Sequence, residues 1–381
     1  MAANKEKRDH RKEMVGRIIT MMEAAGQWDR PWLPSGARPH NPVTGTIYRG
    51  INALALMSAG FEDGRFFTFN NIKALSEKAE KAGEAPIRLK KGSKGTPIFK
   101  AVKINVGGTE DDATSEASKS FMVYAYSGTV FNASQIDGLP APSSDEISTQ
   151  APVENAEFAI RAMREETGLK WEEKPSDNAF YSLTEDRVTV PERTKFRDIT
   201  EFYSTSLHEL GHATAHPSRL NRPLSSRKDM DAYAFEELVA ELTSYFTSAE
   251  TGVPYSGKAH QNHAAYLKSW IEGLRENKNA LFKACSQAAK ASDYIARIAN
   301  EHREKLATQN VFGENSLPAP FGVDSELDID TAFDFSDAMP ADDGPTDDVS
   351  YISRENAFEE FGIEIDNDFS RINSEEFHAG M

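Results

Sequence analysis

The stretch Leu207-His208-Glu209-Leu210-Gly211-His212-Ala213 places two histidines four residues apart, with a glutamate directly after the first. It lies in 202–215, where the spacing of apolar residues predicts a helix. Four helical residues advance about 6 Å, so both imidazoles face one side and can share a metal at about 2 Å each. In such a site Glu209 does not bind the metal but takes a proton from the metal-bound water. The alternative is a pair of ordinary helix histidines.

A catalytic zinc site needs a third protein ligand and one open position. On a continuous helix His216 lies about 12 Å along the axis from His208, and one ion cannot bridge that span. The predicted helix 230–251 places Glu237 and Glu241 on one face, where two like charges are unfavourable unless a positive group lies opposite. The sequence therefore predicts a metal opposite this face, although a solvated acidic face is the alternative.

We predict that His208, His212 and Glu237 are the metal ligands and that Glu241 orients a ligand imidazole. Glu236 is the alternate third ligand, because the rotation of the helix by one residue cannot be read from the sequence. Histidine and carboxylate ligands favour Zn²⁺, with Mn²⁺ as a second choice because carboxylates also suit it.

Composition limits the classes of protein and site. The chain has 381 residues, of which 39% are hydrophobic, and this predicts two domains. The single cysteine, Cys285, excludes an internal disulfide and a cysteine-rich zinc cluster. The charged start and the lack of a long apolar run predict no signal peptide and no membrane partner. We expect a cytoplasmic protein.

The net charge of −17 is concentrated at one end of the chain. Residues 307–381 alone carry −17, with 19 acidic residues against Arg354 and Arg371. Residues 1–105 carry an excess of +9, from 19 basic and 10 acidic residues. The front is therefore suited to a polyanion, whereas the acidic end, which has few apolar residues, predicts a disordered tail.

The pattern of apolar residues predicts an α+β protein. Its front, 1–136, combines helices at 11–25 and 70–83 with strands at 96–106 and 120–130, and we expect these strands to form a hairpin with a mobile tip. A Pro- and Ser-rich stretch, 137–152, predicts a linker. The second domain, 153–306, is predicted to be mostly helical, with a strand or hairpin at 179–190 and helix breaks near Asn277 and Ser292.

The front has the side chains that hold single-stranded DNA, aromatic faces for stacking bases and cations for the backbone. The candidates are Trp28, Arg30, Trp32, Arg38, Tyr48, Arg49, Lys90, Lys91 and Lys94. The lysines belong to the loop Lys90-Lys91-Gly92-Ser93-Lys94-Gly95, whose glycines allow close approach of backbone to phosphate. Core packing of the tryptophans and a merely solvated lysine turn are the alternatives.

These segments together resemble the ArdC-type antirestriction proteins. In the second domain the matching residues are 180–182, 207–212, 216–220, 233–241 and 262–270. In the front they are 28–32, 41–45, 48–50, 91–97, 130–132 and 135–140. The resemblance covers roughly residues 10–306 and excludes the acidic tail.

The resemblance implies a small α/β single-stranded-DNA-binding domain followed by a zincin-like metallopeptidase domain. It further implies a mobile element such as a plasmid or phage, and protection of incoming DNA from restriction endonucleases. Two other functions stay open. The chain can be an active metalloprotease that cleaves a restriction enzyme or another DNA-associated protein, or a non-enzymatic DNA mimic that acts through its acidic tail.

Overall fold

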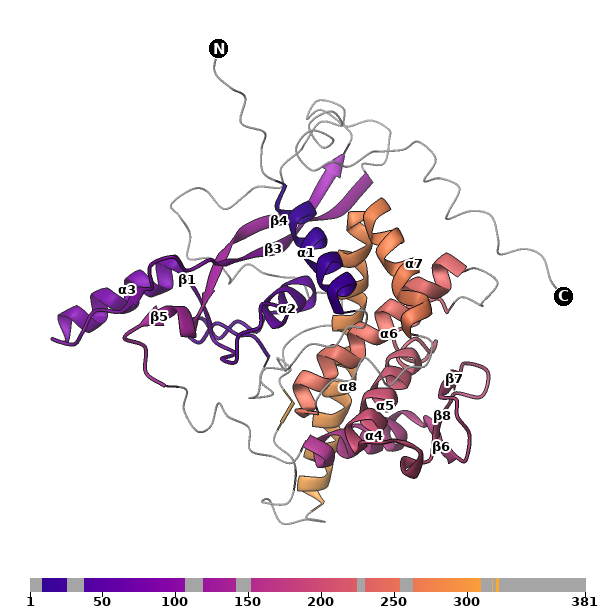
Figure 1. Ribbon diagram of the computed structural model, residues 1–381. Helices are drawn as coiled ribbons and strands as arrows, with labels where there is room; N and C mark the ends of the chain where they lie inside the picture. Colours follow the sequence, from indigo (N-terminus) through magenta and orange to yellow (C-terminus); the bar gives the residue numbers. More distant parts are fainter. Residues whose placement is uncertain are drawn as a thin grey trace, which may run out of the picture. The chain divides into compact units, whose positions relative to one another are not determined.

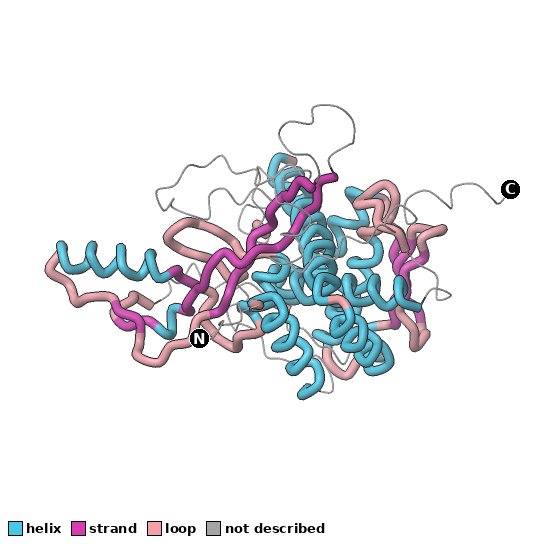
Figure 2. The backbone as a smooth tube through the Cα atoms, turned by 90° about the horizontal axis from the view of Figure 1, so that it is seen from above, coloured by secondary structure: helices cyan, strands magenta, loops and turns pink. Residues whose placement is uncertain are grey.

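The computed structural model describes residues 9–25, 38–106, 119–141, 152–224, 230–253, 263–309, 317, 320 and 321 (Figure 1). Helices make up most of this part of the chain, and Figure 2 shows a pair of long strands together with several short ones. The protein is therefore of mixed α+β class, as the sequence predicts. None of the helices in the described ranges combines the length and apolarity that a membrane crossing requires.

The chain divides into two compact units. The first unit consists of Met1–Ile98 and Gly128–Asp330, so it contains most of the front together with the whole metal-site region. The described part of the second is residues 99–106 and 119–127, which are the end of one long strand and the start of the next. The predicted boundary after residue 136 does not coincide with this division.

The core that holds the site is a group of packed helices. α5 (Ile199–Ala213) packs on α6 (Met230–Thr251), α6 packs on α8 (Lys278–Thr308), and α4 (Pro152–Thr167) contacts all three. Asp198 caps the N-terminus of α5 by accepting a hydrogen bond from the Thr200 N–H at 2.7 Å. From Phe202 to Gly211 every residue of α5 is buried, so this helix lies in the middle of the core.

Small polar side chains bring these helices close together. The Ser244 hydroxyl of α6 donates to the Ser204 carbonyl of α5 at 3.0 Å. The Thr247 hydroxyl donates to the Ser292 hydroxyl of α8 at 3.1 Å. Both hydrogen bonds give buried hydroxyl groups a partner, and the small side chains let the backbones approach.

A three-stranded sheet in the order β6-β8-β7 belongs to the same core. β6 (Lys170–Lys174) is parallel to β8 (Arg187–Pro191), and β7 (Phe180–Ser182) is antiparallel to it. Val188 and Val190 of the central strand are fully buried among the helices. The predicted hairpin at 179–190 is thus present as β7 and β8.

The front begins with α1 (His10–Ala25) and α2 (Gly50–Met57), which both pack on α8. A second sheet follows in the order β1-β4-β3, from β1 (Phe66–Thr68), β3 (Thr96–Val106) and β4 (Lys119–Asn132). α3 (Phe69–Lys81) starts directly after β1 and is capped by Thr68. β2 (Arg88–Leu89) pairs with β5 (Ile136–Asp137), and η1 (Ala133–Gln135) joins β4 to β5. The tip of the predicted hairpin lies outside the described residues.

A largely buried ion-pair cluster fastens the front to α8. Arg38 Nη1 and Arg49 Nη1 donate to the two oxygens of Asp293, at 3.0 Å and 2.6 Å. Arg38 also pairs with Glu250 of α6 and donates to Ser292 at 3.1 Å. Gly50 packs beside Cys285 of α8, because a β-carbon there would be in ordinary van der Waals contact with the Cys285 carbonyl oxygen at 3.6 Å. The front thus forms one unit with the helical core.

The helix break predicted at Asn277 is confirmed, because α7 (His263–Glu276) ends there and Asn277 caps α8. The break predicted at Ser292 is wrong. Ser292 is fully buried and satisfies its hydroxyl against Thr247 and Arg38, so α8 continues through it.

The segment predicted as a tail has a docked beginning. Phe321 is 6% exposed and lies in the main hydrophobic core, with Leu317 beside it. Its N–H donates to Asn300 Oδ1 at 2.8 Å, and its carbonyl accepts from Asn300 Nδ2 at 2.9 Å. The rest of the acidic segment, from residue 322, lies outside the described residues, as does most of the predicted linker, 142–151.

Candidate metal centre

The two motif histidines lie on one face of α5, one helical turn apart. Their ring centroids are 4.8 Å apart, and their Nε2 atoms are 3.1 Å apart. Both Nε2 atoms face the same point rather than solvent, and His208 is only 4% exposed. The motif spacing therefore yields the paired arrangement that the sequence predicts.

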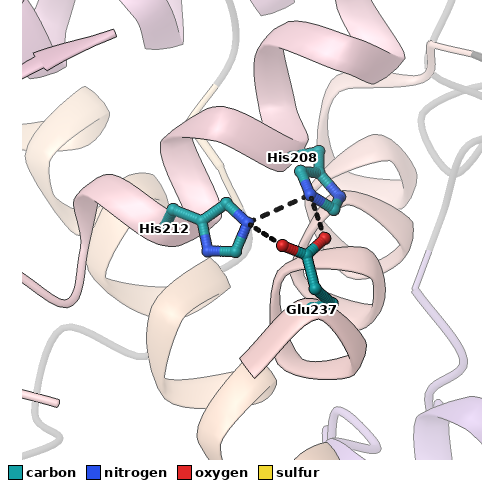
Figure 3. A group of neighbouring side chains, drawn as sticks. All are labelled: His208, His212 and Glu237. Atoms are coloured by element: carbon teal, nitrogen blue, oxygen red, sulfur yellow. Dashed lines mark hydrogen bonds and ion pairs between the residues drawn. The ribbon is translucent and has the colours of Figure 1, made fainter. Parts of the chain in front are cut away.

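Glu237 approaches this point from the neighbouring helix, α6 (Figure 3). Its two carboxylate oxygens lie 3.5 Å from His208 Nε2 and 3.7 Å from His212 Nε2. In the described part of the chain, these three residues are the group of His, Cys, Asp or Glu side chains whose ligand atoms come within 4.8 Å of one another.

The spacing of these donor atoms fits a metal ion. Ligands about 2.0–2.1 Å from a tetrahedral centre are separated from one another by about 3.3–3.4 Å. The two Nε2 atoms are 3.1 Å apart, and each lies 3.5 or 3.7 Å from a different oxygen of Glu237, which is close to that value. Two imidazoles and one carboxylate leave a fourth position of the tetrahedron open, which is the arrangement of a catalytic rather than a structural site.

Gly211 sets the distance between the two ligand-bearing helices. A β-carbon at this position would lie 3.1 Å from Thr243 Cβ and 3.2 Å from both the Cα and the carbonyl oxygen of Ala240. A side chain there would make unusually tight contacts, so the glycine allows the backbones of α5 and α6 to approach closely. This contact brings Glu237 within reach of the two histidines.

Each of the two candidate ligand histidines has a carboxylate on its outer ring nitrogen. His208 Nδ1 donates to Glu241 Oε2 at 3.0 Å, and His212 Nδ1 lies 3.4 Å from Glu236 Oε1. Such partners fix the ring orientation and the tautomer, leaving Nε2 free to bind a metal. Glu241 lies where the sequence predicts. Glu236, the alternate ligand, instead lies on the outer side of His212.

The carboxylates make the centre favourable for positive charge. Burial lowers the pKa of His208, but the hydrogen bonds and charges of Glu237 and Glu241 outweigh burial and raise that pKa well above its usual value. Burial likewise raises the pKa of Glu237, and the two histidines reverse this effect, so its pKa lies well below the usual value. A cation between these groups is therefore stabilised.

Glu209 lies buried beside the two histidines, with a perturbed pKa. It is 4% exposed, and burial raises its pKa despite the opposing charges of His208 and His212. The Tyr181 backbone N–H donates to this carboxylate from β7. Its Oε2 atom is buried and has no hydrogen-bond partner among the described residues. A buried acceptor of this kind is costly unless water or a substrate uses it.

His216 is not part of the centre, as the sequence predicts, but for a different reason. α5 ends at Ala213, so the assumed continuous helix does not reach it. His216 Nδ1 instead accepts from the Ser218 N–H at 3.2 Å in the following turn.

The predicted DNA-binding residues are not brought together as a set. Arg38 and Arg49 are almost buried and paired with Asp293 and Glu250, and Tyr48 is 5% exposed in the core. The prediction for these three residues needs correction. Their sequence neighbours give no sign of Asp293, which pairs with Arg38 although it lies 255 residues further along the chain. Trp28, Arg30 and Trp32 lie outside the described residues.

The lysine loop does reach the surface. Lys90, Lys91 and Lys94 are exposed. The loop backbone is held on η1, because the Lys90 N–H donates to the Gln135 carbonyl at 2.8 Å and Gln135 Nε2 donates to the Lys94 carbonyl at 3.0 Å. The cations therefore sit on a fixed backbone.

Two features escape sequence reasoning. Arg222 pairs with Glu236, but it lies in a loop with no periodicity to mark it. Phe69 is 60% exposed, the highest value among the large apolar side chains in the described ranges. Its place at the start of α3 gives no sign of exposure, because helices bury one face and sequence alone does not show which.

Comparisons with known proteins cover both parts of the chain. Residues 8–131 match the family described as the N-terminal domain of anti-restriction factor ArdC. Residues 159–287 match the family described as zincin-like metallopeptidase. The second match contains the whole candidate centre.

Relatives match most of the length of this chain. The chain is 33% identical to DNA primase TraC of Escherichia coli over 80% of its own length, but it spans only 28% of that primase and 19% of a second one. It is 30% identical to the uncharacterized protein y4eC of Sinorhizobium fredii, covering 74% of this chain and 90% of that protein.

Crystal structures of the antirestriction ArdC protein from plasmid R388 are similar in fold. The metal-free form has a TM-score of 0.58 and 29% identity, covering 77% of this chain and 99% of that one. The Mn(II)-bound form has a TM-score of 0.54 at the same identity, covering 77% and 98%.

Proposed function

The chain belongs to the family of ArdC antirestriction proteins, and from this premise we propose that it protects single-stranded DNA of a mobile element in the bacterial cytoplasm. In this proposal the front binds the DNA and the zincin-like part holds a divalent metal. The observation that carries the proposal is the set of three donor atoms within 4.8 Å of one another on two adjacent helices.

Zn²⁺ is the first choice of metal, because two histidines and one carboxylate suit it. Mn²⁺ is the second choice, supported by the Mn(II)-bound structure of the ArdC protein from R388. An ion held at this centre would supply a Lewis acid that polarises a carbonyl group and lowers the pKa of water.

The residues around the centre are arranged for hydrolysis. Glu209 would take the proton of the attacking water, because its raised pKa makes it a stronger base than an exposed glutamate. The Tyr181 N–H holds this carboxylate in place. Glu241 and Glu236 keep the imidazoles of His208 and His212 turned inward. Cleavage of a restriction enzyme or another DNA-associated protein is the activity that this arrangement supports.

Elemental analysis of the purified full-length chain tests the centre. We expect about one metal per chain in the wild type and none in the His208→Ala, His212→Ala double variant. Circular dichroism checks that this variant is folded. Stoichiometric metal in the folded double variant would contradict the assignment.

Glu209→Gln separates an enzymatic from a binding role. The variant should retain metal and DNA binding but lose any proteolysis, because glutamine cannot accept the proton. If protection from a restriction endonuclease persists in this variant, protection is steric. If protection survives loss of the metal ligands and disappears on removal of residues 322–381, the result favours mimicry of DNA by the tail.

The DNA-binding half of the proposal rests on the lysine loop and on Phe69. β1 and β3 flank β4, and Phe69 follows β1 while Lys94 precedes β3. A β-carbon on Gly95 would collide with Thr129 and Phe131 of β4, so the loop backbone runs close along this strand. An aromatic face and lysines at one end of a sheet suit the bases and phosphates of a single strand.

Fluorescence anisotropy with labelled oligonucleotides tests this interface on the full-length protein. Single strands should bind more tightly than duplex. Log affinity should fall with log salt at a slope of about −0.7 per neutralised phosphate, so Lys91→Ala and Lys94→Ala should each flatten the slope by about 0.7. Phe69→Ala should weaken binding about 5- to 100-fold without changing the slope, because stacking releases no counterions.

Two variants serve as controls for this interface. Lys268→Ala removes an exposed lysine of α7, and Phe180→Ala removes an exposed phenylalanine of β7. Neither should change affinity or slope. Equal effects of the control and loop variants, or equal affinity for duplex and single strand, would count against the proposed interface.

A further inference from the structure

Arg222 lies at the junction of the two helices that carry the metal ligands. Its guanidinium is bidentate on Glu236, with Nη2 at 2.8 Å from Oε1 and Nε at 3.4 Å from Oε2. Both side chains are nearly buried, at 7% and 8% exposed. A buried charge pair of this kind fixes geometry, because each charge is costly without the other.

The same guanidinium also holds the end of α5. Nη2 donates to the Gly211 carbonyl at 2.9 Å, and Nη1 donates to the Thr214 hydroxyl at 2.7 Å. A cation at the C-terminus of a helix satisfies its last carbonyl groups and is favoured by the helix dipole. Arg222 therefore ties the helix of His208 and His212 to the helix of Glu237.

Glu236 and Glu237 are neighbours in sequence but have different places. The Glu236 carboxylate lies on the Nδ1 side of His212, at 3.4 Å, where it also meets Arg222. The Glu237 carboxylate faces the Nε2 atoms. Only one of the two adjacent carboxylates is thus left to bind a metal.

We propose that Arg222 is a positioning residue of the metal centre, which holds Glu236 on the outer nitrogen of His212 and so leaves Glu237 as the carboxylate ligand. This inference rests on the proposed metal function. Arg222 acts through Glu236 and not on the ion itself, so its effect is the orientation of the His212 ring and the choice between two glutamates.

Metal affinity measured on the full-length protein tests the inference. Isothermal titration calorimetry with Mn²⁺, and with chelator-buffered Zn²⁺, gives the dissociation constants. Arg222→Gln and Glu236→Gln should each weaken binding about 10- to 100-fold, the usual effect of losing an outer partner of a ligand. The metal dissociation constant of the double variant should lie within about threefold of that of the weaker-binding single variant, because both changes break the same link.

The absorption spectrum of the Co²⁺-substituted protein gives a readout independent of activity. A turned His212 ring or an exchanged carboxylate should alter the visible bands in Arg222→Gln. Arg222→Lys should restore only part of the affinity, because an ammonium cannot hold both carboxylate oxygens in the planar fork of a guanidinium.

Arg219→Gln is the matched control. Arg219 is also a buried arginine, and it also donates to a carbonyl at the end of α5, that of Ala213 at 2.8 Å. It pairs with Asp186 rather than with a partner of a ligand. Its replacement should lower thermal stability and leave the metal dissociation constants within about threefold of the wild type.

Glu236→Gln conserves shape and keeps the test decisive if Arg222→Gln does not fold. Wild-type affinity in folded Glu236→Gln, fully additive effects in the double variant, or an equal loss in Arg219→Gln would overturn the inference while leaving the metal centre intact. Absence of metal binding in the wild type would overturn the proposed metal function itself, and this inference with it.

Discussion

Gly211 shows how one missing side chain sets the geometry of the centre. In Gly211→Ala the new β-carbon would lie 3.1–3.2 Å from Thr243 and Ala240, and two of the three contacts are with backbone atoms that cannot turn away. We expect α5 and α6 to move apart by a few tenths of an ångström, which shifts Glu237 away from the histidines. We expect a loss of about 1–3 kcal/mol in unfolding free energy and weaker metal binding.

Gly273→Ala is the control for this change. Gly273 is a helical glycine of α7 with no atom within 4 Å of an added β-carbon. Alanine there should stabilise the protein by about 0.5–1 kcal/mol, because it restricts the unfolded chain. Urea unfolding of both variants and metal titration give the comparison. Unchanged metal affinity in Gly211→Ala would show that helix spacing does not control the centre.

At the scale of single residues, the sequence predicts side chains that regular helical spacing places together, and it misses those whose place depends on one tertiary contact. His208 and His212 follow from helical spacing alone, and Glu237 with Glu241 follows from two like charges stacked on one face. The positions of Glu236 and Glu237 relative to His212 depend on a rotation of α6. That rotation is set by contacts of Gly211 and Arg222, which no pattern in the sequence reports.

Among the elements, the β7–β8 turn is joined to the end of α5 by a buried ion pair. Arg219 is 0% exposed, and its Nη1 and Nη2 donate to the two oxygens of Asp186 at 2.8 and 2.7 Å. Tyr181 donates a third hydrogen bond to Asp186 at 2.8 Å. Burial raises the pKa of Asp186, but Arg219 and Tyr181 outweigh it and hold the pKa below its usual value.

The lowered pKa of Asp186 predicts a dependence of stability on pH. A carboxyl group with a lower pKa in the folded state stabilises the protein above the unfolded-state value, near 4, and loses this contribution as the pH falls toward the folded-state value. Asp186→Asn should cost on the order of 3 kcal/mol at neutral pH, because Arg219 is left buried without its partner.

The difference in unfolding free energy between wild type and Asp186→Asn should be constant above about pH 5 and shrink below about pH 4. Asparagine accepts the left-handed backbone of this position, where φ is 45°, so the variant changes charge more than conformation. Urea titrations from pH 3 to 7 measure the difference. A gap that widens toward low pH would contradict the assigned direction of the pKa.

The elements themselves are well predicted where periodicity is long. The helices at 11–25, 70–83 and 230–251 appear with ends shifted by at most two residues, as α1, α3 and α6. The break at Ser292 was wrong because a serine is a poor helix residue in isolation but here meets Thr247 and Arg38. Tertiary partners decide such positions.

At the scale of the whole molecule, we expect two truncations of the end of the chain to differ in their effect on stability. Removal of residues 322–381 should leave the unfolding free energy unchanged within about 0.5 kcal/mol, because a segment so acidic and poor in apolar residues adds little to a core. Removal from residue 310 also takes away Leu317 and Phe321, and should cost about 2–3 kcal/mol.

Thermal and urea unfolding of both truncated chains measure this difference. Phe321→Ala in the full-length chain should reproduce most of the loss, since it empties the same site in the core. If both truncations behave alike, the docking of Phe321 contributes nothing to stability.

The pairing of Arg49 with Asp293 joins positions 244 residues apart. During synthesis Arg49 leaves the ribosome long before Asp293 is made. At about 5–20 residues per second, the interval between the two residues is on the order of 10–50 s. A nascent chain in this interval carries two arginines without their carboxylate, beside an uncovered face of α2. Ribosome-bound chains stalled before residue 278 should therefore be cut by protease in the front, and chains stalled well beyond α8 should resist.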